Sequence, residues 1–199
     1  MVKLLLAGTG LIGHRHMQHI LEHPDLELVG IIDPIITDEK IEGVKTYSSL
    51  NDVNAVAQGI ILATPTDTHA DLTIQSLEMG MHVLVEKPVA ASLLEADEMI
   101  RASEKTGLSI LVGHHRRHHP LVSETINILN SGKIGRPVAA SLMWLMRKQD
   151  EYFDVDWRKG IDGGPVKQNL IHDVDTLRAF FGEIISAVSY THLTLPTKA

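Results

Sequence analysis

The chain has 199 residues, 44% of them apolar and 22% charged, which is the composition of a globular protein with a buried core. Its net charge of −7 argues against a nucleic-acid or anionic-membrane surface, and the absence of cysteine excludes disulfides and thiolate chemistry. The N-terminal apolar run is too short for a signal peptide, and no apolar run approaches the roughly 20 residues of a membrane span. We therefore expect a cytoplasmic protein.

Short apolar runs alternate with amphipathic segments from the N-terminus onward, which predicts βαβ units and a parallel sheet. The runs are nearly continuous in Val, Ile, Leu and Ala, as expected when helices cover both faces of the sheet. The predicted strands are Val2–Ala7, Leu26–Ile32, Gly59–Ala63, His82–Val85 and Ser109–Val112. The predicted helices between them are Leu11–Glu22, Ala70–Met79 and Leu93–Thr106. In the first helix, the residues expected to face the core are Leu11, Ile12, Ile20 and Leu21.

The segment 34–47 is too short and too polar for a crossover helix plus a strand, so we expect a loop or single turn with Lys45–Tyr47 as a short strand at best. After residue 112 the pattern changes to a polar, histidine-rich connection over 114–120. Beyond it we expect a helix over 121–131, a strand over Val138–Met146 and a helix over Asn169–Phe181, with 184–190 as a possible further strand.

These elements predict an α/β fold: a doubly wound, parallel Rossmann sheet over 1–118, followed by the start of a second α/β domain over 119–190. One convincing strand cannot form an independent sheet, so the second domain is expected to be incomplete. Residues 191–199 do not continue its pattern and look like a non-native tail, such as a translated cloning sequence. We therefore expect a truncated gene product.

A glycine fingerprint, Gly8-Thr9-Gly10-Leu11-Ile12-Gly13, stands between the first strand and the first helix. In such a loop the first glycine permits a tight turn, the second lets the backbone approach a pyrophosphate, and the third allows close packing of helix on strand. The phosphates then lie at a helix N-terminus, where free N–H groups and the helix dipole favour negative charge. The context predicts a dinucleotide site, although the bare motif also occurs in ordinary α/β turns.

Asp33 follows the second strand about 20 residues after the fingerprint, the spacing at which a carboxylate reaches the adenosine ribose. A carboxylate there would repel a 2′-phosphate, and the next residue is Pro34 rather than an arginine. The sequence therefore favours NAD over NADP as the cofactor.

Two further segments follow predicted strands at the edge where open α/β sheets bind ligands. Thr64 and Pro65 end one strand, with His69 just beyond, and Glu86-Lys87-Pro88 ends the next. The expected cofactor-binding residues are therefore the fingerprint residues Gly8, Gly10, Leu11, Ile12 and Gly13, together with Asp33, Thr64, Pro65, His69, Glu86 and Lys87. A lysine beside a proline at a strand end is a fixed cation that can polarise or deprotonate a hydroxyl. A single lysine can equally be an ordinary surface residue.

These motifs together resemble the Gfo/Idh/MocA family, the relatives of glucose–fructose oxidoreductase and inositol dehydrogenase. The resemblance runs to about residue 186 and rests on a series of motifs in a fixed order. They are Ala63-Thr64-Pro65 followed by His69, Glu86-Lys87-Pro88, the GHHRRHHP segment at 113–120, Gly163-Gly164 and His172-Asp173. It implies a Rossmann domain joined to an α/β domain whose open, mostly antiparallel sheet forms one wall of the substrate site. It also implies that the full-length form is a homo-oligomer.

In such an enzyme Lys87 would contact the reacting hydroxyl and His172 would act as the catalytic acid/base. The family often has an aspartate four residues before that histidine, where this chain has Gln168, with Asn169 as a substitute hydrogen-bond donor. The expected reaction transfers a hydride between nicotinamide and a secondary alcohol or ketone of a sugar, cyclitol or cyclic hydroxy-acid. The substrate-binding candidates are Lys87, Arg158, Gln168, Asn169 and His172.

Other assignments stay open at this point. Arg116 and Arg117 could bind a substrate carboxylate or form salt bridges across the two domains. The histidines of the first helix and of the connection after residue 113 lack the converging ligand set of a metal centre, so no metal is expected. A non-catalytic NAD-binding regulator or an inactive fragment is the alternative to an active enzyme. A Rossmann methyltransferase would explain Asp33 but not Lys87 with His172.

Overall fold

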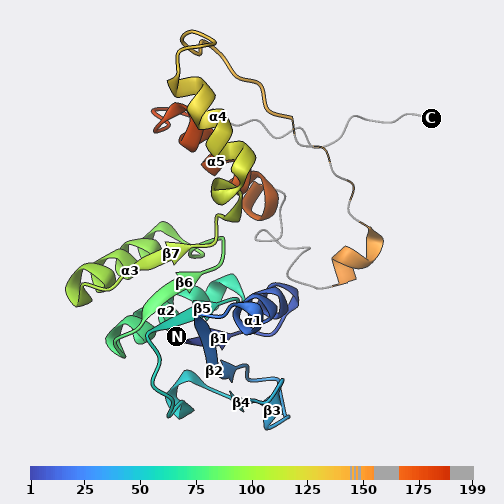
Figure 1. The fold of residues 1–199 in the computed structure, drawn as a ribbon, viewed down its shortest axis with the longest axis vertical. Helices are drawn as coiled ribbons and strands as arrows, with labels where there is room; N and C mark the ends of the chain where they lie inside the picture. Colours follow the sequence, from blue (N-terminus) through green and yellow to red (C-terminus); the bar gives the residue numbers. More distant parts are fainter. Residues whose placement is uncertain (144, 146, 148, 155–165, 189–199) are drawn as a thin grey trace. The chain divides into compact units, whose positions relative to one another are not determined.

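The structure is a computed structural model that describes residues 1–143, 145, 147, 149–154 and 166–188 (Figure 1). The chain divides into two compact units. The first comprises residues 1–114 and 147–169, and the second comprises residues 115–146 and 170–199. The predicted domain ranges, 1–118, 119–190 and 191–199, are not tested by this division and stay predictions.

A seven-stranded sheet forms the centre of the described part of the first unit, in the order β3-β4-β2-β1-β5-β6-β7. Every neighbouring pair is parallel except β3 and β4. The strands are β1 (Val2–Ala7), β2 (Leu26–Ile32), β3 (Lys40–Ile41), β4 (Val44–Tyr47), β5 (Gly59–Leu62), β6 (His82–Val85) and β7 (Ile110–Val112). Because β1, β2, β5 and β6 run parallel, the loops that follow them share one edge of the sheet. The strand order changes direction at β1, which is where open α/β sheets bind ligands.

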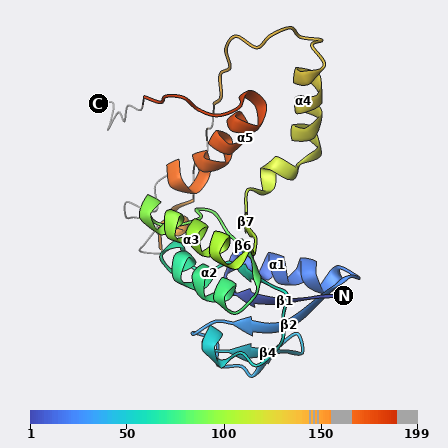
Figure 2. The ribbon, with the colours of Figure 1, turned by 90° about the vertical axis from the view of Figure 1, so that its left-hand side faces the viewer.

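Helices cover both faces of this sheet, which confirms the predicted α/β, doubly wound fold (Figure 2). Successive residues of a strand point to opposite faces, so Leu5 and Leu6 belong to separate cores. The core around Leu6 includes Met17 and Ile20 of α1. The helices are α1 (Leu11–Glu22), α2 (His69–Glu78) and α3 (Leu93–Thr106), with short 3-10 turns η1 (Leu50–Asp52) and η2 (Thr66–Thr68).

The predicted buried face of α1 is wrong at three of its four positions. Leu11 and Leu21 are 74% and 47% exposed and Ile12 is 38% exposed, whereas only Ile20 is buried as predicted. The helix turns Gly13, Met17 and Ile20 toward the sheet instead. Gly13 must lie against the preceding loop, and this close approach fixes the rotation of the helix more strongly than the apolar residues of its first turn do.

The segment 34–47 was expected to be a loop or single turn with Lys45–Tyr47 as a short strand at best. The structure has that strand as β4 and adds β3, with which it forms a hairpin. Glu42 and Gly43 make its two-residue turn with φ of +50° and +81°. Two successive positive φ values are what a tight hairpin requires, because that turn matches the twist of the strands. Glutamate is an unusual residue at the first of these positions, which is why the segment lacks the common sequence signal of a hairpin.

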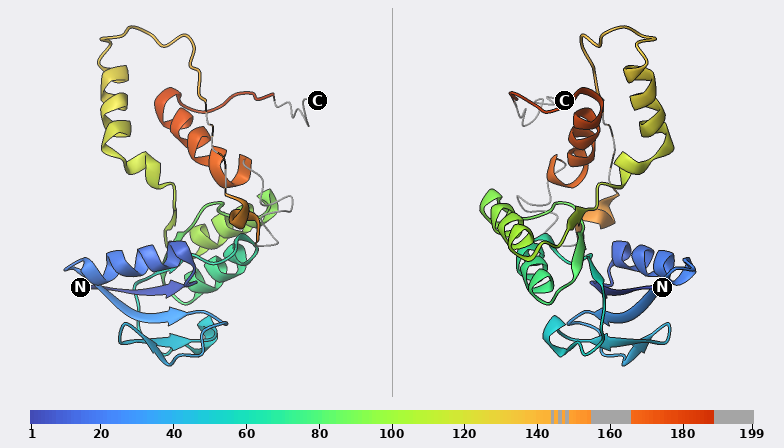
Figure 3. Two further views of the ribbon diagram at one scale, coloured as in Figure 1. Left: turned by 90° about the vertical axis from the view of Figure 1, so that its right-hand side faces the viewer. Right: turned by 60° about the vertical axis from the view of Figure 1, so that its left-hand side comes forward.

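The described residues of the second unit are helical or irregular. They form η3 (His115–His118), α4 (Pro120–Asn130) and α5 (Ile171–Phe181), and α4 packs against α5 (Figure 3). A π-helical turn (Val166–Leu170) precedes α5, and η4 (Asp150–Asp154) lies in the first unit.

The strand predicted over Val138–Met146 is not formed at residues 138–143 or 145, and residues 184–188 are not a strand either. A strand needs a neighbour to satisfy its backbone groups, and none of the described residues of this unit provides one. Val138 and Leu145 are accordingly 88% and 84% exposed. Within the described ranges, no helix is both long enough and apolar enough to cross a membrane.

Candidate functional site

The loop after β1 and the first turn of α1 each need a glycine for reasons of packing. Gly8 has φ of +89°, and a Cβ there would come within 2.5 Å of the carbonyl oxygen of Ala63. A Cβ on Gly13 would overlap the carbonyl oxygen of Gly8. The loop is therefore pressed between β5 and its own helix, and any larger residue at either position would displace backbone.

Gly10 is under no such packing constraint, because a Cβ there would meet nothing within 4 Å. Gly10 is the N-cap of α1, no side chain caps the helix, and its first turn holds no acidic residue. Free N–H groups, the positive end of a helix dipole and unfilled space beside the backbone suit a pyrophosphate. The residues present thus fit the phosphates of a dinucleotide, and Leu11 and Ile12 begin the helix that would receive them.

Asp33, at the end of β2, is bound directly to this loop. Its Oδ2 accepts hydrogen bonds from the Thr9 hydroxyl at 2.6 Å and the Thr9 amide at 3.0 Å, and its Oδ1 accepts from the Ile35 amide at 3.0 Å. Burial alone would raise the pKa of Asp33, but these donors outweigh it and hold the pKa below its ordinary value of 3.8. The carboxyl group is therefore an anion fixed beside the glycine loop.

The loop after β5 is tied to the loop after β6 by a buried histidine. His69 is 1% exposed, and its ring nitrogens lie 2.8 Å from the carbonyl oxygen of Pro88 and 3.0 Å from that of Thr64. The Thr68 hydroxyl donates to Thr64 Oγ1 at 2.7 Å and to the carbonyl of Pro65 at 2.8 Å. Thr64 is partly exposed and Pro65 is exposed at this edge, whereas the His69 ring is engaged by backbone on both sides.

Glu86 and Lys87 follow β6, and Glu86 joins them to α1. Its Oε1 lies 2.9 Å from His16 Nε2, and its Oε2 accepts from the Lys87 amide at 3.2 Å. Burial would raise the pKa of Glu86, but His16, through its hydrogen bond and charge, and Lys87 keep the pKa below its ordinary value of 4.5. A Cβ on Gly113 would come within 2.9 Å of the Glu86 carboxyl carbon, so glycine there makes room for it.

The Lys87 ammonium donates to the backbone carbonyl of Gln168 at 3.0 Å, within the first unit. This contact brings a predicted substrate-binding position to the predicted catalytic lysine through the backbone of Gln168 rather than its amide. Asn169 lies next to it and is partly buried. His172 lies in the second unit and is 6% exposed, and Arg158 falls outside the described residues.

Sequence reasoning did not single out Thr9 and His16 as contacts of this edge. Thr9 occupies a position of the fingerprint where the motif sets no residue, and His16 was one of several histidines in α1 without a distinguishing signal. Each has its partner on another strand end, 24 and 70 positions away in sequence. Only the folded sheet brings these pairs together.

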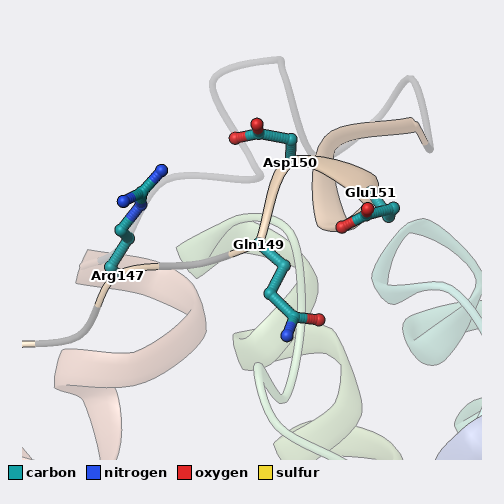
Figure 4. A pocket seen from close by; sticks show the side chains of 4 residues that line it. All are labelled: Arg147, Gln149, Asp150 and Glu151. Atoms are coloured by element: carbon teal, nitrogen blue, oxygen red, sulfur yellow. The ribbon is translucent and has the colours of Figure 1, made fainter.

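A separate hollow of about 440 Å³ is lined by Arg147, Gln149, Asp150 and Glu151 (Figure 4). All four come from one short stretch of chain, and none lies on the loops at the carboxyl ends of the strands, so it is not a candidate for the cofactor site. In the described ranges no three His, Asp or Glu side chains gather as metal ligands would.

The model of the Gfo/Idh/MocA oxidoreductase family, described as an NAD-binding Rossmann fold, matches residues 2–114, more than half of the chain. The chain belongs to this family. The resemblance found in the sequence motifs is thereby confirmed, and the matched range contains the glycine loop, Asp33 and Lys87.

Individual members of the Gfo/Idh/MocA family are similar along nearly the whole chain. Inositol 2-dehydrogenase of Rhizobium meliloti is 28% identical, over 100% of this chain and 60% of that protein. The scyllo-inositol 2-dehydrogenase (NAD(+)) of Bacillus subtilis is 29% identical, over 94% of this chain and 56% of that protein. The crystal structure of the WlbA dehydrogenase of Bordetella pertussis, solved with NADH and UDP-GlcNAcA, has a TM-score of 0.79 and 26% identity, over 91% of this chain and 55% of that one. The chain thus spans little more than half the length of these relatives.

Proposed function

We propose that this chain forms the nucleotide-binding part of an NAD-dependent dehydrogenase. In this proposal it transfers a hydride between nicotinamide and a secondary alcohol or ketone of a sugar, cyclitol or cyclic hydroxy-acid. The observation that carries the proposal is the glycine loop with Asp33 bound to it through Thr9. The two inositol dehydrogenases among the relatives support the cyclitol as substrate class. The full-length form is proposed to be a homo-oligomer.

The preference for NAD is argued from the charge of Asp33. Its carboxylate is held ionised beside the loop, so it can accept hydrogen bonds from ribose hydroxyls and repels a 2′-phosphate. The substitution Asp33→Asn should therefore narrow the gap between NADH and NADPH affinity by about tenfold or more. Titration of cofactor fluorescence measures both dissociation constants, and Asp97→Asn, an exposed position on α3, is the matched control.

Bound NAD would supply the hydride acceptor, the nicotinamide C4. The Lys87 ammonium stabilises the alkoxide that develops on the substrate oxygen, and the His172 imidazole accepts the hydroxyl proton. The alcohol thereby loses one hydride and one proton and becomes a ketone. Arg158, Gln168 and Asn169 are proposed to bind the substrate. Thr64 and Pro65 are proposed to contact the cofactor, with Glu86 and His69 positioning the loops around it.

The test is the formation of NADH at 340 nm with NAD and a panel of inositols, aldoses and cyclic hydroxy-acids. Lys87→Met should abolish turnover and leave NADH affinity within about threefold, because the lysine acts on the substrate oxygen. A chain that does not bind NADH overturns the proposal. Binding without reduction of NAD by any substrate favours the non-catalytic regulator or an inactive fragment. Full turnover by Lys87→Met removes that lysine from the mechanism.

A further inference from the structure

A second set of contacts lies entirely in the second unit and joins η3 to α5. The rings of His115 and His172 meet edge to face, with centroids 4.8 Å apart and planes inclined by 63°. Arg116 Nη1 donates to Asp173 Oδ1 at 2.7 Å. Thus two neighbouring residues of η3 contact two neighbouring residues of α5 that lie 57 positions further along the chain.

The next residue of η3, Arg117, donates three hydrogen bonds to Asp175. Its guanidinium donates to Oδ1 at 2.6 Å, to Oδ2 at 3.1 Å and to the backbone carbonyl of Asp175 at 3.2 Å. The hydrogen bond to Asp175 raises the pKa of Arg117 above its ordinary value. A bidentate fork of this kind fixes direction as well as distance, which a lysine could not do.

The α5 side of these contacts is buried and the η3 side is not. His172, Asp173 and Asp175 are 6%, 8% and 7% exposed, whereas the Arg116 and Arg117 side chains are 39% and 42% exposed. A carboxylate removed from water is costly unless a cation and hydrogen bonds compensate it. The position of α5, with two buried carboxylates in its first two turns, therefore depends on the arginines.

We propose that His115, Arg116 and Arg117 form a positioning clamp that fixes His172 in the second unit. The three contacts are made at His172 itself and at two positions that follow it on α5, Asp173 and Asp175, and the first sets the His172 ring against His115. Both arginines form salt bridges, as one of the two sequence-based alternatives has it, but with partners in their own unit. Its functional meaning rests on the proposed function, in which His172 accepts the substrate proton.

The clamp also brings two opposite charges close to His172, because Asp173 is its neighbour in the chain and Arg116 is bound to Asp173. Asp173 favours the imidazolium form of His172, and Arg116 opposes that effect. Asp173 Oδ2 is buried without a hydrogen-bond partner among the described residues, so the charge of the carboxylate is compensated at one oxygen only. The other ionisable groups on the elements packed around α5, and on α5 and the segment after it, are His115, Arg117, His118, Glu124, Asp175, Arg178 and Glu183.

The experiment is a pH titration of the histidine Hε1 signals of the 199-residue chain by NMR, with the His172 signal assigned from His172→Gln. Arg116→Gln should raise the midpoint of His172 by about half a unit or more, because Asp173 then acts uncompensated. Asp173→Asn should lower it by a similar amount. A merely structural role would move the midpoint the same way in both variants.

Conservative variants keep the test valid if the first ones fold poorly. Arg116→Lys retains the charge and should keep the midpoint within about 0.2 unit of the wild type. Exchanging the partners, Arg117→Asp with Asp175→Arg, should restore the His172 signal that Arg117→Met perturbs. Arg101→Gln, an exposed arginine of α3, is the control and should change nothing.

The clamp would be overturned if the titration midpoint of His172 moved in the same direction in Arg116→Gln and Asp173→Asn, or did not move in either. The titration uses neither cofactor nor substrate, so it is independent of the proposed dehydrogenase activity. If the opposite shifts are found but His172→Gln retains full turnover, the clamp stands and the proposed role of His172 fails. If His172→Gln is inactive and the shifts are missing, the proposed role stands and the clamp fails.

Discussion

At the start of α1, an added methyl group should weaken cofactor binding at Gly10 and destabilise the fold at Gly13. Gly10 has φ of −63° and open space around it, so Gly10→Ala should leave the free energy of unfolding unchanged within about 0.5 kcal/mol. The methyl group would occupy the space proposed for the pyrophosphate, so NADH affinity should fall about tenfold or more. Gly13→Ala should instead destabilise the fold by about 1–3 kcal/mol, because the Gly8 carbonyl blocks the new methyl group.

Urea unfolding and NADH fluorescence titration separate the two effects. Gly80→Ala is a useful comparison, since Gly80 also has open space but a φ of +85°, so its cost is a backbone cost alone. If Gly10→Ala binds NADH as tightly as the wild type, the phosphates do not lie against the start of α1.

The bond between Thr9 and Asp33 predicts a stability contribution that disappears in acid. The pKa of Asp33 is lower in the folded chain than its ordinary value of 3.8, so ionised Asp33 stabilises the fold. This contribution is fully present above 3.8 and is lost as the pH falls from there through the folded pKa. The stability difference between wild type and Asp33→Asn should therefore be equal at pH 7 and pH 5 and shrink below 3.8. Urea unfolding at each pH measures it, and a difference that grows in acid would contradict the assignment.

The sequence predicts the position of a site residue when that residue directly follows a strand. Asp33 and Lys87 each come directly after an apolar run, so topology alone puts them at one edge. The sequence could not indicate that Thr9 binds Asp33 or that His16 binds Glu86. Those contacts depend on the rotation of α1, which is fixed by the packing of Gly13 rather than by an apolar stripe.

At the scale of elements, prediction succeeded where an element is stabilised locally or by sequential neighbours. The strands and helices of the βαβ units lie within a residue or so of their predicted limits. The strand over Val138–Met146 was wrong at the described positions because an apolar run does not make a strand without a partner. The hairpin β3–β4 was missed for the opposite reason, since its partner is adjacent but its turn uses glutamate at positive φ.

The start of α3 provides a prediction about a single element. Ser92 accepts a hydrogen bond from the Glu95 amide at 3.2 Å, and Glu95 Oε2 accepts from the Ser92 amide at 3.3 Å. This reciprocal capping satisfies two backbone donors that a helix start leaves open. Ser92→Ala should therefore cost about 1 kcal/mol of unfolding free energy, measured in urea. Glu98→Ala, an exposed glutamate of the same helix, should cost less than about 0.5 kcal/mol, and equal losses would show that the cap contributes nothing specific.

At the scale of the whole molecule, the proposed cofactor contacts and the proposed clamp belong to different units. The glycine loop, Asp33 and Lys87 belong to the first, and the three contacts between η3 and α5 belong to the second. A family member binds its cofactor through the part that the family model matches, residues 2–114. Cofactor binding and the positioning of His172 are therefore expected to be separable properties of this chain.

Hydrogen exchange with and without NADH tests that separation. A ligand present at 100 times its Kd stabilises the unit that binds it by about 2.7 kcal/mol, which slows exchange through global opening about a hundredfold. Peptides from β1, β2, β5 and β6 should show this slowing, because their buried amides exchange only when the sheet opens. Peptides from α4 and α5 should exchange at unchanged rates, since none of the proposed cofactor contacts lies in them. Gly10→Ala at the same NADH concentration is the control and should lose most of the protection. Equal slowing in α4 and α5 would show that the two units open together, and the cofactor would then also stabilise the helix that carries His172.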